Sequence, residues 1–278
     1  MLVLNKLRIR FQRGEEAKYI SHLDIIKVFE RALKRANISV EYTKGRNSHP
    51  QMVFGLPLPV GITSEAEYVD IDLKETIEPE QFLKRVNNSF PAGFKILAVE
   101  YNKSGDNIMA SIRLASYDII LGTINCDNIE ELENCFLGVL SRVYFLVKKV
   151  SKGRTKEINA RPFIKGITVK VFKKSRFNKE LNKKNRNINI CNNDFLLKYL
   201  DNLSKGTIPN SRYSIDNTFC LSITVSAGST ANLNPVLFLS GFNKEYKTDL
   251  EIVKMHRTGL YGIINDSVKN PMDYNVLQ

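Results

Sequence analysis

The sequence predicts an α+β protein made of two ferredoxin-like (β-α-β-β-α-β) halves, the second with a basic insert. Short segments alternate apolar and polar residues, as half-buried strands do, and longer segments repeat apolar residues at helical spacing. The order strand, helix, strand, strand, helix, strand occurs twice. We therefore expect an N-terminal half over residues 1–102, a C-terminal half over 103–264 with the insert at about 173–206, and a flexible tail over 265–278.

The first half begins with an expected strand over residues 2–12, where Leu7, Ile9 and Phe11 alternate with basic residues. A helix follows that begins after Ser21, a good N-cap residue, and carries one apolar stripe. The stripe comprises Ile25, Val28, Phe29, Ala32, Leu33 and Ala36. The remaining elements are expected to be a strand near 38–42, a Gly- and Pro-rich loop over 44–64, a strand at 69–73, a helix from Pro79 to about Phe90 and a strand over 94–101.

The second half is expected to begin after a polar boundary segment, Asn102 to Asn107. Its elements are expected at 108–114 (strand), 128–147 (helix), 167–172 (strand), 219–225 (strand), 234–242 (helix) and 252–256 (strand). The insert ends in a predicted helix that stops at Gly206, because glycine readily adopts the left-handed backbone that ends many helices.

The composition is that of a globular protein, with 43% hydrophobic residues in a chain of 278. No run of about 18 or more apolar residues occurs, so no membrane span is expected. The first residues alternate apolar and basic types and lack the continuous apolar stretch of a signal peptide. The four cysteines are scattered, without CxxC spacing, which fits reduced thiols in a cytoplasmic protein.

The net charge of +12 is concentrated in one segment. Residues 148–186 hold 15 Lys+Arg and 2 Asp+Glu, a net charge of +13 that leaves −1 for the rest of the chain. Such a segment indicates a polyanion partner, most often nucleic acid. The alternative is a solvated loop in a Lys- and Asn-rich protein. The cations at the start of the segment are the predicted RNA-phosphate ligands: Lys148, Lys149, Lys152 and Arg154.

The three histidines, His22, His49 and His256, are the candidate catalytic residues. His22 follows the helix N-cap, where the helix dipole favours a neutral imidazole suited to general-base work or anion contact. His49 lies in the turn from Gly45 to Pro50, whose glycine and proline restrict the backbone. We expect His22 and His49 to share one site. The alternative is that each packs locally and only shapes its helix start or turn.

Further candidate phosphate ligands lie beside these motifs, namely Arg46, Asn47, Arg161 and Arg257. For Arg161 and Arg257 the alternative is surface charge without a ligand, and for Arg46 and Asn47 it is turn chemistry that only shapes the loop. Glu65 and Glu67 suit acid–base work or cation binding, but acidic residues on an alternating strand more often pair with basic neighbours. We therefore favour pairing across adjacent strands between basic and acidic residues of this half: Lys6, Arg8 and Arg10 with Asp70 and Asp72.

Four motifs together resemble the bacterial radical-SAM-linked family, a domain of unknown function. They are SHLD at Ser21 to Asp24, GRNSHP at Gly45 to Pro50, SEAEYVD at Ser64 to Asp70 and HRTGLY at His256 to Tyr261. The resemblance implies RNA- or ribosome-linked work beside a radical SAM protein. Because this chain lacks CxxxCxxC, we expect that protein to be encoded separately. GxxxxGKS/T and GxGxxG are also missing, and neither a cofactor nor a metal site is predicted.

The first functional hypothesis is an RNA-binding accessory protein that presents rRNA or tRNA to a radical SAM enzyme. In this hypothesis the chain is a non-catalytic partner rather than a stand-alone enzyme. A second hypothesis is a metal-independent endoribonuclease that uses His22, His49 or His256. A third is a small-molecule or peptide-binding accessory domain in which the Pro- and Gly-rich loop forms a pocket wall.

Overall fold

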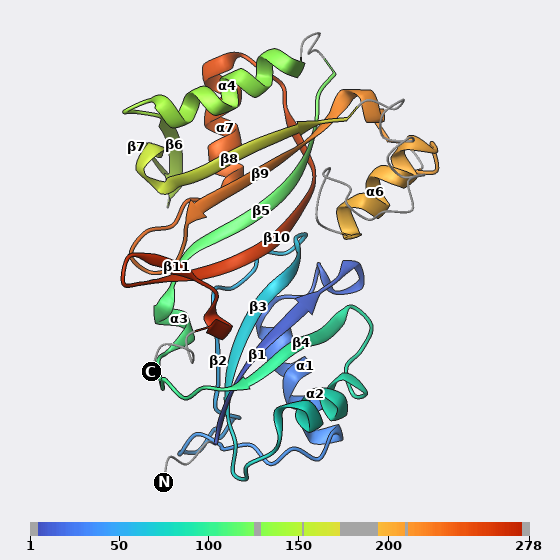
Figure 1. Cartoon of the computed structure of the whole chain (residues 1–278), viewed down its shortest axis with the longest axis vertical. Coiled ribbons are helices and arrows are strands. Elements are labelled where there is room, and N and C mark those ends of the chain that lie inside the picture. The colour runs from blue at the N-terminus through green and yellow to red at the C-terminus, as the bar shows by residue number, and fades with distance from the viewer. Residues whose placement is uncertain (1–4, 125–128, 152, 173–193, 209–210, 274–278) are drawn as a thin grey trace. The chain divides into compact units, whose positions relative to one another are not determined.

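The structure, a computed structural model, describes residues 5–124, 129–151, 153–172, 194–208 and 211–273. It has mixed α and β content and divides into two compact units (Figure 1). Unit 1 comprises Met1–Ala115, Ala227–Thr230 and Arg257–Gln278, and unit 2 comprises Ser116–Ser226 and Ala231–His256. The predicted boundary segment from Asn102 to Asn107 lies within unit 1.

Unit 1 contains an antiparallel sheet with helices on one face (Figure 1). Its elements are β1 (Lys6–Arg13), α1 (His22–Arg35), β2 (Met52–Phe54), β3 (Thr63–Asp72), α2 (Pro79–Asn87), β4 (Phe94–Tyr101) and α3 (Ile108–Ser111). The strands lie in the order β4-β1-β3, and β2 also pairs with β3. Alternate residues of β1, such as Leu7 and Ile9, are buried against Phe29 of α1 and Phe82 of α2. This sheet and its two helices therefore share one core.

Local sequence signals explain both long helices of unit 1. The Ser21 side chain accepts a hydrogen bond from the Asp24 N–H at the start of α1. The helix ends before Asn37, whose φ of 50° lies in the left-handed region that asparagine tolerates. Pro79 occupies the first turn of α2, where its missing N–H costs nothing. The predictions for α2 and β4 are confirmed, and β4 has the predicted bounds, Phe94–Tyr101.

Unit 2 has helices on both faces of its strands. Its elements are α4 (Ile129–Ser141), β6 (Leu146–Ser151), β7 (Arg154–Asn159), β8 (Ile164–Val171), α6 (Asp194–Ser204), β9 (Thr218–Ser226) and α7 (Pro235–Tyr246), with parts of β5 (Ile112–Gly122) and β10 (Glu251–Ile264). The strand order is β10-β5-β9-β8. Phe136 of α4 stacks on Phe242 of α7 with ring centroids 3.8 Å apart, and it also contacts Phe219 of β9. Cys220, the next residue of β9, packs in a separate cluster with Leu200 of α6.

The second strand of unit 1 differs from the sequence prediction. The segment expected to be a strand near 38–42 forms only isolated bridges, Val40 with Leu73 and Tyr42 with Pro50. The strand β2 lies instead inside the predicted loop, where Met52 pairs with Ile71. Pairing partners far along the chain decide which extended segment joins a sheet, so local alternation alone could not choose between the two.

Three further segments also differ from prediction. Ile108–Ser111, expected to begin a strand, is the helical turn α3, because the Asn107 side chain accepts from the N–H groups of Met109 and Ala110. The helix expected to reach residue 147 ends at Ser141, and a hairpin of β6 and β7 follows. Part of the expected tail forms β11 (Ser267–Lys269), which pairs with β10. Residues 173–193 of the insert lie outside the described residues, but its second part is helical up to Ser204, with Gly206 at φ +66° as expected.

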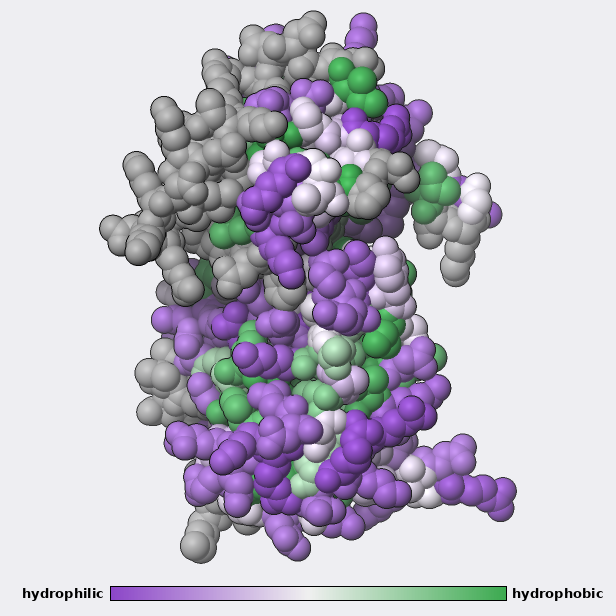
Figure 2. Space-filling model, turned by 90° about the vertical axis from the view of Figure 1, so that its right-hand side faces the viewer, coloured by the Kyte–Doolittle hydropathy of each residue, from purple (hydrophilic) through white to green (hydrophobic). Residues whose placement is uncertain are grey.

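In the described part of the chain, no helix combines the length and the apolar character that a membrane crossing needs. The face drawn in Figure 2 is largely hydrophilic, with hydrophobic side chains in small separate groups. Scattered apolar groups of this kind are normal on a protein surface.

Candidate nucleic-acid interface

The basic segment begins on a two-stranded ribbon, formed by β6 and β7, whose sequence favours a tight hairpin. Ser151 pairs with Arg154, so only two residues connect the strands. Gly153 has a φ of +73°, and such connections require positive φ, which glycine adopts without steric cost. Lys152, the other connecting residue and a predicted RNA ligand, lies outside the described residues.

The register of this ribbon, called here the basic ribbon (Leu146–Asn159), sorts its charges by face. Lys149 pairs with Lys156, and Lys148 pairs with Glu157. Directly opposite residues project from the same face, and so do residues two apart on one strand. Arg154 therefore shares a face with Lys149 and Lys156, whereas Lys148 lies on the other face opposite a carboxylate. All five side chains are exposed.

The base of the basic ribbon is held firmly against the rest of unit 2. Val147 is buried, and Gly241 of α7 lets it approach so closely that a Cβ at position 241 would lie 2.5 Å from Val147 Cγ1. The Asn159 side chain accepts from the Phe145 N–H at 2.9 Å and donates to the Val143 carbonyl at 3.2 Å. A fixed base with exposed cations on the strands above it is suited to contact with a phosphate backbone, because little backbone entropy is lost on binding.

An exposed aromatic ring accompanies the cations of the ribbon. Tyr144, at its base, is 68% exposed, and Val150 near its tip is 70% exposed. Aromatic side chains beside a basic surface provide stacking platforms for unpaired bases. The segment from Tyr144 to Asn159 thus carries both exposed cations and an exposed aromatic ring.

The other predicted cations are placed differently. Arg161 donates to the Leu140 carbonyl from both Nε (3.1 Å) and an Nη (2.5 Å), and to the Ile164 carbonyl at 2.9 Å. These bonds cap the last turn of α4, a common role for arginine. Arg46 and Asn47 are exposed in the loop between Tyr42 and Pro50, where they are accessible to a ligand.

Arg257 is buried inside unit 1 and ion-paired. Its guanidinium is 1% exposed and lies 3.0 Å from Glu67 Oε1, and it also donates to the Leu56 carbonyl at 2.8 Å. A phosphate would have to displace the Glu67 carboxylate from a buried position, so this geometry does not favour a surface phosphate contact at Arg257. Local sequence patterns do not indicate this pairing, because 190 residues separate the two partners.

The predicted cross-strand charge pairs of unit 1 are confirmed for two of the three basic residues. Arg8 bonds Asp70 through two nitrogens, at 2.8 and 2.9 Å, and Lys6 lies 3.3 Å from Asp72. Arg10 donates instead to the Glu65 carbonyl at 2.9 Å. Burial acts to lower the pKa of Arg8, but its hydrogen bonds and charge interactions with Asp70 and Asp106 outweigh burial and raise it. The Arg8–Asp70 pair is therefore a buried structural pair.

The three histidines lie in different surroundings. His22, the first residue of α1, makes an edge-to-face contact with Phe54, with ring centroids 5.4 Å apart. His49 is exposed, and its Nδ1 lies 3.1 Å from the Thr43 hydroxyl. His256 is fully buried in unit 2.

His22 contacts the far end of the segment from Pro50 to Phe54, whereas His49 directly precedes its start. The chain from Pro50 to Phe54 is extended, and extended chain rises about 3.3 Å per residue, which puts the Cα of His49 roughly 16 Å from that of Phe54. Since His22 packs on Phe54, this separation argues against one shared site. Among the described residues, no group of three or more His, Cys, Asp or Glu side chains is placed to hold a metal ion.

The structure adds one cation to those that the sequence predicts for the interface. Lys149 and Arg154 are predicted RNA ligands, and Lys156, which is not among the predicted ligands, lies on the same face. The short polar stretch around Gly153, between alternating segments, is the signal that could have indicated a hairpin and so placed Lys156 opposite Lys149.

Comparison with known proteins identifies a family. No curated protein matches the chain. Among solved structures, similarity is found to the "Crystal Structure of a Cbf5-Nop10-Gar1 Complex", with 8% identity, a TM-score of 0.42 and coverage of 92% of this chain and 49% of that one. This chain thus spans about half the length of that protein.

A second solved structure, the "Crystal Structure of an Unknown Protein from Galdieria sulphuraria", shows 10% identity and a TM-score of 0.23, with 91% of this chain and 98% of that one covered. TM-scores this low do not indicate a shared fold. The model of a bacterial family, described as "Uncharacterized protein conserved in bacteria (DUF2344)", matches residues 6–192. The match spans more than half of the sequence, and the chain therefore belongs to this conserved bacterial family.

Proposed function

We propose that this protein is an RNA-binding accessory protein that holds the RNA phosphate backbone on the basic ribbon. The observation that carries the proposal is the direct pairing of Lys149 with Lys156, with Arg154 on the same face. Like charges opposite each other destabilise a ribbon, so an anion between them would relieve the repulsion. RNA supplies such anions at regular spacing, and Tyr144 offers a ring for an unpaired base.

The proposal includes a radical SAM enzyme, encoded separately, as the partner that receives the RNA, with rRNA or tRNA as the substrate class. The support is the set of four sequence motifs from Ser21 to Tyr261, together with the absence of CxxxCxxC from the sequence. In this proposal the protein works in the cytoplasm and presents RNA rather than cutting it.

We also propose that each unit is built on a ferredoxin-like half. The support is the strand order. In unit 1, β2 pairs with β3 beside β1 and β4, which gives β4-β1-β3-β2. In unit 2 the order is β10-β5-β9-β8. When the four strands of each sheet are numbered in chain order, leaving out β6 and β7, the spatial order in both units is fourth, first, third, second. Sheets of this type are common platforms for RNA.

RNA binding can be tested by fluorescence anisotropy with a labelled RNA hairpin, at several salt concentrations. The variant Lys149→Gln/Lys156→Gln should bind more weakly and lower the slope of log K against log salt by about 1.5, since each lost phosphate contact removes about 0.7 to 0.9. The matched control is Lys198→Gln/Lys244→Gln, which removes the same charge from exposed positions on α6 and α7. A slope that the two double variants change equally would contradict the ribbon as the binding site.

A further inference from the structure

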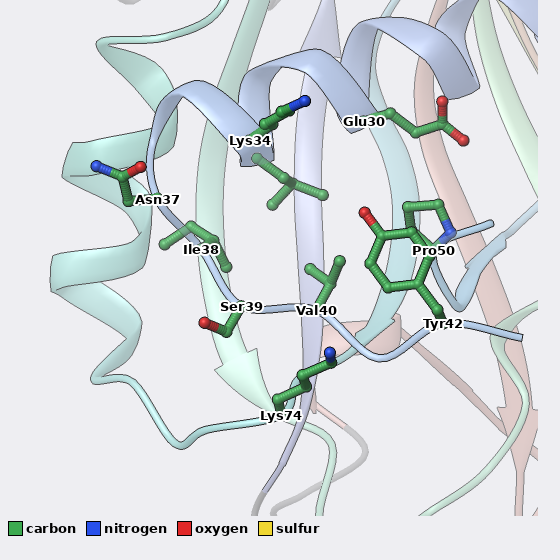
Figure 3. Close-up of a pocket in the computed structure, with 10 residues that line it drawn as sticks. Glu30, Lys34, Asn37, Ile38, Ser39, Val40, Tyr42, Pro50 and Lys74 are labelled. Atoms are coloured by element: carbon green, nitrogen blue, oxygen red, sulfur yellow. The ribbon is translucent and has the colours of Figure 1, made fainter. Parts of the chain in front are cut away.

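Unit 1 contains a pocket with a volume of about 410 Å³, a size typical of small-molecule sites (Figure 3). It lies between the end of α1, the segment that follows it and the start of the chain after β3. Ile38 and Val40, both buried, contribute to the apolar part of its lining. Lys34, Lys74, Glu30 and Tyr42 supply charge and an aromatic ring.

The charged groups of the pocket are available to a ligand. Lys34 comes from α1 and Lys74 follows β3, so the two cations reach the pocket from different elements (Figure 3). Neither lysine, nor Glu30, forms a hydrogen bond or ion pair through its side chain with another residue that the structure describes. Glu30 is the single carboxylate of the lining. The lining therefore carries a net positive charge, which favours an anion.

The main chain at the aromatic residue of the pocket is held in place, while the ring itself stays partly open to solvent. Tyr42 is bridged to Pro50, and its carbonyl accepts from Gln51 Nε2 at 3.1 Å. The side chain is nevertheless 46% exposed, and Lys74 Nζ lies 5.9 Å from the ring centroid. In Figure 3 the ring stands beside Pro50 with its hydroxyl directed toward α1. A planar ligand can thus stack on Tyr42 and place an attached anion near Lys74.

We propose that this pocket binds a nucleoside 5′-monophosphate, with the base stacked on Tyr42 and the phosphate between Lys34 and Lys74. A phosphate needs the two cations, and a base needs the ring and the apolar lining. The same chemistry has two sources, a free mononucleotide or the 5′-phosphorylated end of an RNA strand. The proposal does not depend on RNA binding by the basic ribbon, because all the pocket residues belong to unit 1.

Isothermal titration calorimetry with the full chain tests the site. The probes are AMP, GMP, CMP and UMP, with adenosine as the ligand without the anion and inorganic phosphate as the ligand without the ring. Lys34→Gln and Lys74→Gln should each weaken monophosphate binding about fivefold and leave adenosine binding unchanged. Tyr42→Leu should weaken both the monophosphates and adenosine about tenfold. The matched control is Lys84→Gln, an exposed lysine of α2 outside the pocket.

Two further probes distinguish the source of the ligand, a short single-stranded RNA with a 5′-phosphate and the same RNA with a 5′-hydroxyl. They are titrated into the Lys149→Gln/Lys156→Gln variant, so that the basic ribbon contributes little. A clear preference for the phosphorylated RNA over free monophosphates, lost in the Tyr42→Leu background, assigns the pocket to an RNA end. Tighter binding of a free monophosphate assigns it to a mononucleotide.

Three results would overturn the proposal. The first is that neither the monophosphates nor the phosphorylated RNA bind at millimolar concentration. The second is that inorganic phosphate binds as tightly as the best monophosphate, which would make the pocket an anion site without a base. The third is that Lys34→Gln, Lys74→Gln and Tyr42→Leu all bind like Lys84→Gln, which would place the ligand elsewhere. Because the substituted side chains are exposed, circular dichroism should show that each variant keeps its fold.

Discussion

Lys149 and Lys156 stand directly opposite each other on β6 and β7, and both are exposed. Paired side chains of neighbouring antiparallel strands have Cβ atoms about 4.5 to 5.5 Å apart, so the two ammonium groups repel each other. The ribbon forms because Val147 and Phe145 anchor its base in the core of unit 2. The repulsion at its tip is thus a local cost that a bound polyanion would remove.

Replacing Lys156 with Glu should separate stability from binding. Lys156→Glu converts a repulsive pair into an attractive one, so the protein should become more stable by about 0.5 kcal/mol, while RNA affinity falls. Thermal unfolding and RNA anisotropy on the same preparation measure both quantities. Lys198→Glu on α6 is the control, with the same change in net charge. A variant that binds RNA as tightly as the parent chain would count against the proposed interface.

The ion pair between Arg8 and Asp70 should be essential to unit 1. Both side chains are 2% exposed, so Arg8→Met leaves a buried carboxylate without its cation and should cost about 3 to 5 kcal/mol of unfolding free energy. The neighbouring pair of Lys6 and Asp72 is 33% and 28% exposed, and Lys6→Met should cost less than about 1 kcal/mol. Urea denaturation of the two variants compares two charge pairs that lie two residues apart along the same strands. Equal losses would mean that burial does not set the strength of these pairs.

Asp118 in unit 2 should make stability depend on pH. Burial raises its pKa above the usual value of 3.8, although a hydrogen bond from Ser222 and the charge of Lys170 act to lower it. A raised pKa in the folded state means that Asp118 favours folding below the unfolded pKa, and that this contribution is lost as pH rises through the folded pKa. Asp118→Asn, which keeps an acceptor for Ser222, should therefore be more stable than the parent chain at neutral pH.

The advantage of Asp118→Asn should shrink as the pH falls toward 4. Melting temperatures of both proteins from pH 4.5 to 8 measure it, with Asp266→Asn as an exposed control that should show no such trend. If the stability advantage of Asp118→Asn instead grew at low pH, the pKa of Asp118 would be lowered by folding and not raised.

The separation of the two N-terminal histidines predicts independent effects. His22→Ala removes the edge contact with Phe54 and should cost about 1 kcal/mol of stability, whereas His49→Ala, in an exposed loop, should cost little. The double variant should equal the sum of the single variants to within about 0.5 kcal/mol. Urea denaturation of all three decides it. A clear departure from additivity would restore the hypothesis of a shared site.

Elements with local signals could be predicted from sequence, and those that depend on distant partners could not. The alternating residues from Phe94 to Tyr101 and the proline at position 79 determine β4 and the start of α2 by themselves. The choice of Met52–Phe54 over residues 38–42 as the second strand depends on the pairing of Met52 with Ile71. The alternating segment from Ile108 to Leu114 leads into the strand β5, but its first four residues form α3 because Asn107 caps them.

The candidate site shows the same division. Net charge alone located the basic segment, since composition needs no structure. The face on which Lys149 lies, and its partner Lys156, follow from the register of a hairpin, which sequence spacing did not define. The pocket beside Tyr42 depends on two isolated β-bridges, Tyr42 with Pro50 and Val40 with Leu73, and local sequence patterns do not predict such pairings.

Arg257 is a predicted phosphate ligand that the structure places in the interior of unit 1, and variants of it can distinguish the two roles. Its ion pair with Glu67 predicts a structural role: Arg257→Met should cost about 3 to 5 kcal/mol by removing the cation that pairs directly with the buried Glu67. Glu67→Gln leaves the Arg257 charge without its carboxylate and should also destabilise unit 1. The double variant Arg257→Met/Glu67→Leu should recover only part of the loss, because it leaves neither partner of the pair alone but removes the carboxylate whose charge also stabilises the buried Arg13.

RNA binding distinguishes this structural role from a phosphate contact. Where Arg257→Met remains folded, as judged by circular dichroism below its melting temperature, the slope of log K against log salt should match that of the parent chain, because a side chain 1% exposed does not meet a phosphate in solution. The Lys149→Gln/Lys156→Gln variant, measured alongside, should lower the slope without lowering the melting temperature. A slope reduced by about 0.7 to 0.9 in Arg257→Met would show that this arginine leaves Glu67 for an RNA phosphate when RNA binds.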